Sequence, residues 1–229
     1  MKTFTEWLKL RKYGVDAGTS DAIALAKKSL GISTNEWFIF ENYDASHALI
    51  VVDVQNDFVN GSLPVPGAKE IIPYVNNLAN NIRNSGGIVV YTADLHPANH
   101  VSFKGQGGQW PSHCVVNTFG SQFVPDLEVN GPIFDKATEP DKDSYSGFGG
   151  KLRSQKPTTL ETYLKEHNVT NVIVCGLALD YCVLATATDS KKHGFNTTVY
   201  LPGSRAVNNK EIETLIAKIK QQGIKIIAT

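Results

Sequence analysis

Cysteine and methionine are scarce in this sequence. Only three cysteines and one methionine occur among its 229 residues. Three cysteines cannot all pair, and they are too few to cross-link a chain of this length, which excludes a disulfide-stabilised secreted scaffold. We expect a reducing, cytoplasmic environment in which Cys114, Cys175 and Cys182 are each a small buried hydrophobe, a ligand or a nucleophile.

Long apolar runs and an excess of charge of one sign are also absent. No uninterrupted apolar run is longer than residues 48–52, far short of the roughly 20 residues that span a bilayer. The N-terminal residues lack the apolar core and the cleavage site of a signal peptide. The 22 basic and 22 acidic side chains cancel, so no overall field favours nucleic acid or an anionic membrane surface. We expect neither as a partner, and a small neutral molecule as the substrate.

Hydrophobic residues make up 41% of the chain, enough for one main domain with a substantial core. Short β-branched runs alternate with helical patterns, which is typical of a parallel sheet covered by helices on both faces, an α/β/α fold. The expected strands are residues 48–54, 88–92, 133–136, 171–176, 197–201 and 224–228. The expected helices are residues 68–85, 159–167, 180–193 and 209–222.

Two segments do not follow this alternation. We expect residues 1–46 to form an N-terminal extension, with a helix at 20–30, ahead of a domain at residues 47–229. The extension contains Trp7 and Trp37 and is too apolar for a free tail, so we expect it to pack on the core or on a second copy in a homo-oligomer. Residues 94–132 are rich in His, Gly, Pro and Trp, and a loop of this length in a compact domain is usually functional.

Chemistry is expected at the carboxyl ends of the strands. In a doubly wound sheet, ligands bind where the strand order reverses. If the order is the common 3-2-1-4-5-6, the first and fourth strands are neighbours at this point. Asp53 ends the first strand and Cys182 follows the fourth.

Cys182 lies at the start of the helix at 180–193, where free backbone N–H groups stabilise a thiolate and can hold an oxyanion. A buried structural cysteine is the other interpretation. Asp53 is a carboxylate at the end of a buried strand, where burying a charge costs free energy unless the group has a partner or a function. Removing a thiol proton would be such a function. It could instead cap the next segment, and Asp57 is equally suited to either role. Lys136 would keep a carboxylate ionised and stabilise negative charge on a substrate oxygen, unless it is simply solvated.

The long loop contains a candidate metal site. Asp94 and His96 lie at its start, and His113 lies further along. Imidazole and carboxylate ligands suit zinc, iron or manganese, and three protein ligands leave positions open for water or substrate. Any one histidine could be a solvated surface residue. His100 is a fourth ligand or a nearby hydrogen-bond partner, and Cys114 is a weaker candidate than His113.

Aromatic residues lie on segments that lead out of the same loops. They are Phe58, Trp110, Tyr145 and Phe148. Such side chains would form the walls of a site for a flat ring, although core packing is the routine explanation for any one of them.

Together these pieces resemble the nicotinamidase family of the isochorismatase-like hydrolases, which have a six-stranded α/β/α fold. The matching pieces, in the family order, are Asp53-Val-Gln-Asn-Asp-Phe58, Asp94-Leu-His96-Pro, Trp110-Pro-Ser-His113-Cys, Lys136, Tyr145-Ser-Gly-Phe148 and Gly176-Leu-Ala-Leu-Asp-Tyr-Cys182. They cover the chain from about residue 47 to the C-terminus. All six pieces in this order are highly specific for the family.

The resemblance implies the roles of the reacting residues. Cys182 would be the nucleophile, Asp53 the base that takes its proton, and Lys136 the third member of the triad. A cis peptide before Ala178 would let the amides of Ala178 and Cys182 form the oxyanion hole. The substrate would be nicotinamide, hydrolysed to nicotinate and ammonia in NAD salvage, and pyrazinamide would also be accepted.

The resemblance also implies the binding residues. Asp94, His96 and His113 would hold one divalent metal, zinc in the first place with iron or manganese as alternatives, and this metal would meet the pyridine nitrogen. Phe58 and Trp110 would flank the ring, with Tyr145 as a further contact.

Two other functions compete with this hypothesis, and the sequence departs from the family pattern at two places. A carbamoyl or ureido amidohydrolase would keep the triad without needing the metal cluster, and a non-catalytic binding scaffold would not need the triad. Isochorismatase itself is disfavoured because those enzymes lack the cysteine found at Cys182. The departures are the charged and polar segment between Lys136 and Tyr145, and residues 1–46, which the family core does not have.

Overall fold

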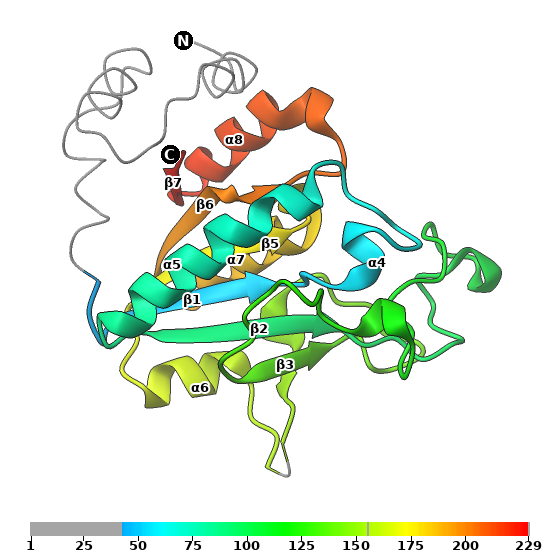
Figure 1. Ribbon diagram of the computed structural model, residues 1–229, viewed down its shortest axis with the longest axis horizontal. Helices are drawn as coiled ribbons and strands as arrows, with labels where there is room; N and C mark the ends of the chain where they lie inside the picture. The colour runs from blue at the N-terminus through cyan, green and yellow to red at the C-terminus, as the bar shows by residue number, and fades with distance from the viewer. Residues whose placement is uncertain (1–42, 155, 229) are drawn as a thin grey trace.

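The computed structural model describes residues 43–154 and 156–228 (Figure 1). The expectations for residues 1–42, including the helix at 20–30 and the packing of the extension, lie outside this part of the chain. Within the described residues, no helix has the length and apolar character that crossing a membrane requires.

A seven-stranded sheet forms the centre of the domain (Figure 1). Its strands are β1 (His47–Val52), β2 (Ile88–Asp94), β3 (Ile133–Lys136), β4 (Lys151–Leu152), β5 (Asn171–Leu177), β6 (Asn196–Arg205) and β7 (Lys225–Ile227). The order is β4-β3-β2-β1-β5-β6-β7, and every pair is parallel except β3 with β4. The six parallel strands therefore stand in the expected doubly wound order. The antiparallel β4 adds a seventh strand, and its two residues are too few to show a period in the sequence.

Helices cover both faces of the sheet, which confirms the α/β/α architecture (Figure 1). They are α5 (Ile72–Asn84), α6 (Leu160–Glu166), α7 (Leu184–Lys192) and α8 (Ile212–Gln221), and the single turn α4 (Asn56–Val59) follows β1. Alternate residues of β1 face opposite layers: Leu49 and Val51 pack with the apolar face of α5, whereas Ile50 packs with α6, α7 and α8. A strand buried on both faces explains the continuous apolar run in the sequence.

The helix at 180–193 differs from the expectation at its start. Leu179–Val183 form a π-helical turn before α7 begins at Leu184. The helices at 68–85 and 209–222 likewise begin with short 3₁₀ turns, at Ala68–Ile71 and Asn209–Glu211.

Strands β1 and β5 approach closely near their carboxyl ends. A Cβ atom at Gly176 would lie 2.1 Å from the Val52 carbonyl oxygen, and Gly176 has a φ of 117°. Only glycine meets both requirements. The glycine thus permits the end of β5, which leads to Cys182, to lie against the end of β1, which leads to Asp53.

The long loop after β2 folds back on itself. The amide of His96 donates to the Cys114 carbonyl at 3.0 Å, and the amide of Val116 donates to the His96 carbonyl at 2.8 Å. This short parallel pairing brings the two halves of the loop, and with them His96 and His113, side by side.

Candidate active site

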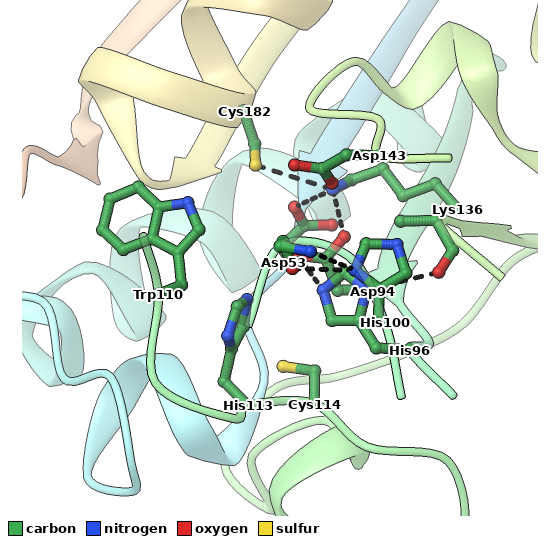
Figure 2. Close-up of polar contacts among 12 residues, drawn as sticks. Asp53, Asp94, His96, His100, Trp110, His113, Cys114, Lys136, Asp143 and Cys182 are labelled. Atoms are coloured by element: carbon green, nitrogen blue, oxygen red, sulfur yellow. Dashed lines mark hydrogen bonds and ion pairs between the residues drawn. The ribbon is translucent and has the colours of Figure 1, made fainter. Parts of the chain in front are cut away.

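Four segments bring polar side chains together at the carboxyl edge of the sheet (Figure 2). Asp53 directly follows β1, Asp94 is the last residue of β2, and Lys136 is the last residue of β3. Cys182 comes from the π-helical turn after β5. One carboxylate oxygen of Asp53, one of Asp94 and the Cys182 sulfur all lie within 4.8 Å of one another. The structure thus places the expected thiol, carboxylate and ammonium groups next to each other.

Lys136 lies at the centre of this group. Its Nζ atom is 3.0 Å from Asp53 Oδ2 and 3.5 Å from Cys182 Sγ, and it also donates to Asp94 Oδ1. A further bond of 3.2 Å goes to the Ser144 carbonyl. The lysine side chain is fully buried, so its charge is acceptable only because two carboxylates surround it.

Burial and charge set the protonation states. Burial raises the pKa of Asp53 to about 6, although the ammonium of Lys136 acts to lower it. Burial also acts to raise the pKa of Asp94, but Lys136 and His96 outweigh it and hold this pKa below the usual carboxyl range. Burial raises the pKa of the Cys182 thiol well above its ordinary value, with Lys136 opposing the shift. At neutral pH an ionised Asp53 therefore faces a protonated thiol.

The backbone aims Asp53 at this cluster. The residue has a φ of 50°, so the chain turns sharply where β1 ends. The Thr92 hydroxyl donates to Asp53 Oδ1 at 2.7 Å, and the Asp53 amide donates to the Thr92 carbonyl at 3.2 Å. With Oδ1 held by Thr92, Oδ2 faces Lys136.

Asp57 does not share this position. Its Oδ2 atom accepts the Cys114 amide at 2.7 Å, and its Oδ1 atom accepts the Ser62 amide at 3.0 Å. Of the two aspartates that the sequence left open, Asp53 is therefore the one beside the thiol, and Asp57 secures loop backbone.

The peptide bond between Leu177 and Ala178 is cis, as the resemblance implies. The Ala178 carbonyl accepts the amides of Tyr181 and Val183, at 3.0 and 3.1 Å. Ala178 and Cys182 both line the same pocket. Cys182 therefore sits in a π-helical turn at the edge of this pocket, directly after the cis peptide.

Asp94, His96 and His113 form a second cluster beside the first (Figure 2). One ligand atom from each lies within 4.8 Å of the others, and all three side chains are buried. The Nδ1 atom of His96 pairs with the Ala137 carbonyl at 3.2 Å, and that of His113 pairs with the Pro111 carbonyl at 2.8 Å. Backbone carbonyls thus orient both rings, as outer partners of metal-binding histidines do.

The remaining donor atoms fit a divalent metal. His96 Nε2 is buried, has no hydrogen-bond partner among the described residues, and lies 3.6 Å from Asp94 Oδ2. Lys136 occupies the other oxygen of Asp94. A buried imidazole nitrogen facing a carboxylate oxygen and a second imidazole matches the ligands of zinc or iron, so the chain has a cluster that can hold a metal.

Two neighbouring side chains do not complete this cluster. His100 uses both ring nitrogens, pairing Nδ1 with the Ser102 hydroxyl at 2.7 Å and Nε2 with the Lys142 carbonyl at 3.2 Å. This favours the hydrogen-bond role over a fourth ligand. Cys114 is buried, with its sulfur 3.8 Å from the Gly120 carbonyl, and burial raises the pKa of its thiol.

The Cys182 thiol and the cluster of Asp94, His96 and His113 line one pocket. Phe58, Trp110 and Tyr145 are among the residues that line it. The Trp110 indole donates to the Tyr145 hydroxyl at 3.0 Å, which joins two of the walls. Phe148 is not among the lining residues, because its ring stacks on His193 at a centroid distance of 4.9 Å.

The sequence hypothesis missed several lining residues. They are Leu63, Val65, Ser102, Asp143, Ser144, Tyr181 and Val207. Tyr181 could have been suspected because it directly precedes Cys182, and its ring packs on Trp110 at a centroid distance of 5.0 Å. Val207 comes from the segment after β6 and carries no local signal.

A thiol beside a carboxylate and an ammonium, at the carboxyl edge of a doubly wound sheet, is an arrangement that suits nucleophilic catalysis by a cysteine hydrolase. The isochorismatase domain model matches residues 47–229, and the chain belongs to this family. The nicotinamidase of Escherichia coli (strain K12) is 38% identical over 179 residues, which is 70% of this chain and 84% of that protein.

Solved structures agree with this assignment. The pyrazinamidase of Pyrococcus horikoshii in complex with zinc is 43% identical, with a TM-score of 0.73, and the match covers 80% of this chain and 99% of that one. PnC1 of L. infantum in complex with nicotinate is 31% identical, with a TM-score of 0.73, and the match covers 81% and 94%.

Proposed function

We propose that this protein is a nicotinamidase that hydrolyses nicotinamide to nicotinate and ammonia. The observation that carries the proposal is that one pocket holds both the Cys182 thiol and the cluster of Asp94, His96 and His113. A thiol suits attack on a carboxamide, and a metal facing it suits recognition of a ring nitrogen. The nicotinamidase and pyrazinamidase relatives support the same substrate class.

The first half of the reaction acylates Cys182. Asp53 takes the thiol proton while the sulfur attacks the carboxamide carbon, and the carbonyl oxygen becomes an oxyanion. The backbone amides of Ala178 and Cys182 stabilise this oxyanion. The intermediate then collapses: the carbon–nitrogen bond breaks, Asp53 returns its proton to the nitrogen, and ammonia leaves a thioester on the sulfur.

The second half releases the acid. Asp53, ionised again, takes a proton from a water molecule, whose oxygen attacks the thioester carbon. The second tetrahedral intermediate expels the Cys182 sulfur, which recovers the proton from Asp53, and the acid ionises to nicotinate. A base with a pKa of about 6 is suited to this exchange, because it is mostly ionised at neutral pH yet readily holds a proton.

Lys136 keeps the two carboxylates ionised and lies close enough to Cys182 to stabilise a developing thiolate. Asp94, His96 and His113 would hold the metal, zinc in the first place, which supplies an electrophilic position for the pyridine nitrogen. Phe58 and Trp110 would flank the ring, and Tyr145 would hold Trp110 in place. A carbamoyl or ureido substrate has no aromatic ring or ring nitrogen, so neither the cluster of Asp94, His96 and His113 nor these aromatic side chains would contribute to its recognition.

An ammonia-release assay on nicotinamide, combined with metal analysis of the purified protein, tests the proposal. We expect turnover in the parent protein and none in Cys182→Ala, with the bound metal retained because Cys182 is not among its ligands. Substantial ammonia release by the variant would refute the nucleophile assignment. A parent protein that is inactive on nicotinamide would refute the substrate.

A further inference from the structure

Gln55 is a fully buried polar side chain that the proposed reaction does not use. Its Nε2 atom donates to the Asp94 carbonyl at 2.8 Å and to the Ser121 carbonyl at 2.8 Å. Its Oε1 atom accepts the Asp94 amide at 2.9 Å. Two of its three bonds therefore go to the backbone of one residue, a candidate metal ligand.

These bonds replace the strand pairing that β1 does not provide to Asp94. The register of β1 and β2 ends at Val52 with Thr92, because the chain turns away at Asp53. On its other side, Asp94 is still paired with Lys136 of β3. Without a partner on the β1 side, the buried amide and carbonyl of Asp94 would be unsatisfied, which is costly. The Gln55 carboxamide has the same donor and acceptor as a peptide group, and it occupies that place.

The same short segment also secures the other half of the cluster. Asp57, on α4, accepts the amide of Cys114, the residue that follows His113. The third bond of Gln55 reaches Ser121, further along the same loop. One segment after β1 thus holds the backbone at Asp94, at the start of the long loop, and the backbone beside His113, near the middle of that loop.

We propose that Gln55 is a positioning residue for the metal centre: it holds the Asp94 backbone so that the carboxylate already faces His96 and His113 before a metal binds. Asp57 does the same for His113 through Cys114. Ligands that are held in place lose less freedom on binding, and loss of such outer partners typically lowers metal affinity about 10–100-fold. The proposal rests on the metal site of the proposed function.

The test compares zinc affinity in two Gln55 variants with the parent protein. Gln55→Glu has the same shape but places a carboxylate against the carbonyls of Asp94 and Ser121. Gln55→Met removes the hydrogen bonds without adding charge. Its zinc affinity tests the proposal if the Glu variant fails to fold. Gln122→Glu is the matched control, because Gln122 is exposed, directly follows Ser121 in the long loop, and undergoes the same chemical change as Gln55→Glu.

Zinc dissociation constants are measured on the metal-free proteins by competition with a chromogenic chelator, alongside circular dichroism and melting temperatures. We expect both Gln55 variants to bind zinc about 10–100-fold more weakly while keeping the parent fold, and Gln122→Glu to match the parent. At saturating zinc, kcat should return to within severalfold of the parent value.

A purely structural role would lower the melting temperature of the metal-free protein and leave the zinc affinity of the folded protein unchanged. That result, or equal losses in the control, would overturn the proposal. A parent protein that binds zinc but does not release ammonia from nicotinamide would refute the proposed function instead, and the comparison of zinc affinities would still decide the role of Gln55.

Discussion

The buried ammonium of Lys136 offers the sharpest test of the site's electrostatics. Lys136→Met keeps an unbranched side chain that is one atom shorter, and it removes the charge between Asp53 and Asp94. At the observed 3.0 Å from Asp53, and with an effective dielectric constant of about 20, the attraction of one such pair is about 5.5 kcal/mol. Desolvation cancels part of it, and breaking a buried pair typically costs about 3–5 kcal/mol.

We therefore expect the metal-free variant to lose about 3–5 kcal/mol of unfolding free energy at pH 8, or roughly 10 °C in Tm. The deficit depends on pH. Without Lys136, two buried carboxylates face each other, and each has a pKa above its unfolded value. Protonation then favours the folded state, so the deficit shrinks as the pH falls from 8 to 5. Turnover should fall about as far as in Cys182→Ala, because groups that act as one unit are not additive.

Urea unfolding at both pH values measures this effect. Lys165→Met is the matched control, because Lys165 is 56% exposed and pairs with Glu161 on the surface. Such pairs contribute about 1 kcal/mol or less, so the control should stay close to the parent. If Lys136→Met is as stable as the control at pH 8, or if its deficit does not change with pH, the electrostatic reasoning is wrong.

Three further predictions concern the base, the rim and the substrate. Thr92→Val removes a hydrogen bond that lowers the pKa of Asp53, so the acid limb of the kcat/KM profile should move from about pH 6 to a higher pH. An acid limb at the same or a lower pH would contradict the role of Thr92. Asp143 lines the pocket, so Asp143→Asn should lower the inhibition constant of anionic nicotinate about two- to threefold at low salt and leave KM for nicotinamide unchanged. The exposed Asp141→Asn serves as control, and equal effects in the two variants would exclude a specific role. Benzamide, which lacks the ring nitrogen, should lose about 2 kcal/mol, or roughly 30-fold in kcat/KM; parity with nicotinamide would remove the metal from substrate recognition.

Much of the fold and the proposed reacting groups could be predicted from the sequence because the pattern there is local. Each parallel strand is a short apolar run, and the carboxyl ends of such strands meet at one edge. Asp94 and Lys136 end two of these strands and Asp53 directly follows a third, so their proximity followed once the strand order was assumed. The π-helical turn at Leu179–Val183 was not predictable, because it differs from an α-helix by one residue in the hydrogen-bond pattern.

Other features depend on tertiary packing and left no local signal. Phe148 and Tyr145 belong to one motif, but only Tyr145 lines the pocket. His100 and His113 belong to one loop, and only the detailed hydrogen bonds separate them: both ring nitrogens of His100 are paired, whereas His113 pairs through Nδ1 and belongs to the cluster with Asp94. The role of Gln55 depends on where β1 ends relative to β2, which is a property of the strand register.

The pairing of Lys136 with Asp94 has the widest consequence for how the site works. From the sequence, Lys136 was assigned to Asp53 and Cys182, and Asp94 to the metal, as if the two groups of residues were separate. In the structure, one ammonium contacts both carboxylates, and the second oxygen of Asp94 faces His96. Any change of charge at Asp94 therefore alters how strongly Lys136 holds Asp53 ionised. Variants of the metal ligands should change the pH profile of turnover as well as zinc affinity, so kinetic effects of such variants cannot be read as loss of substrate binding alone.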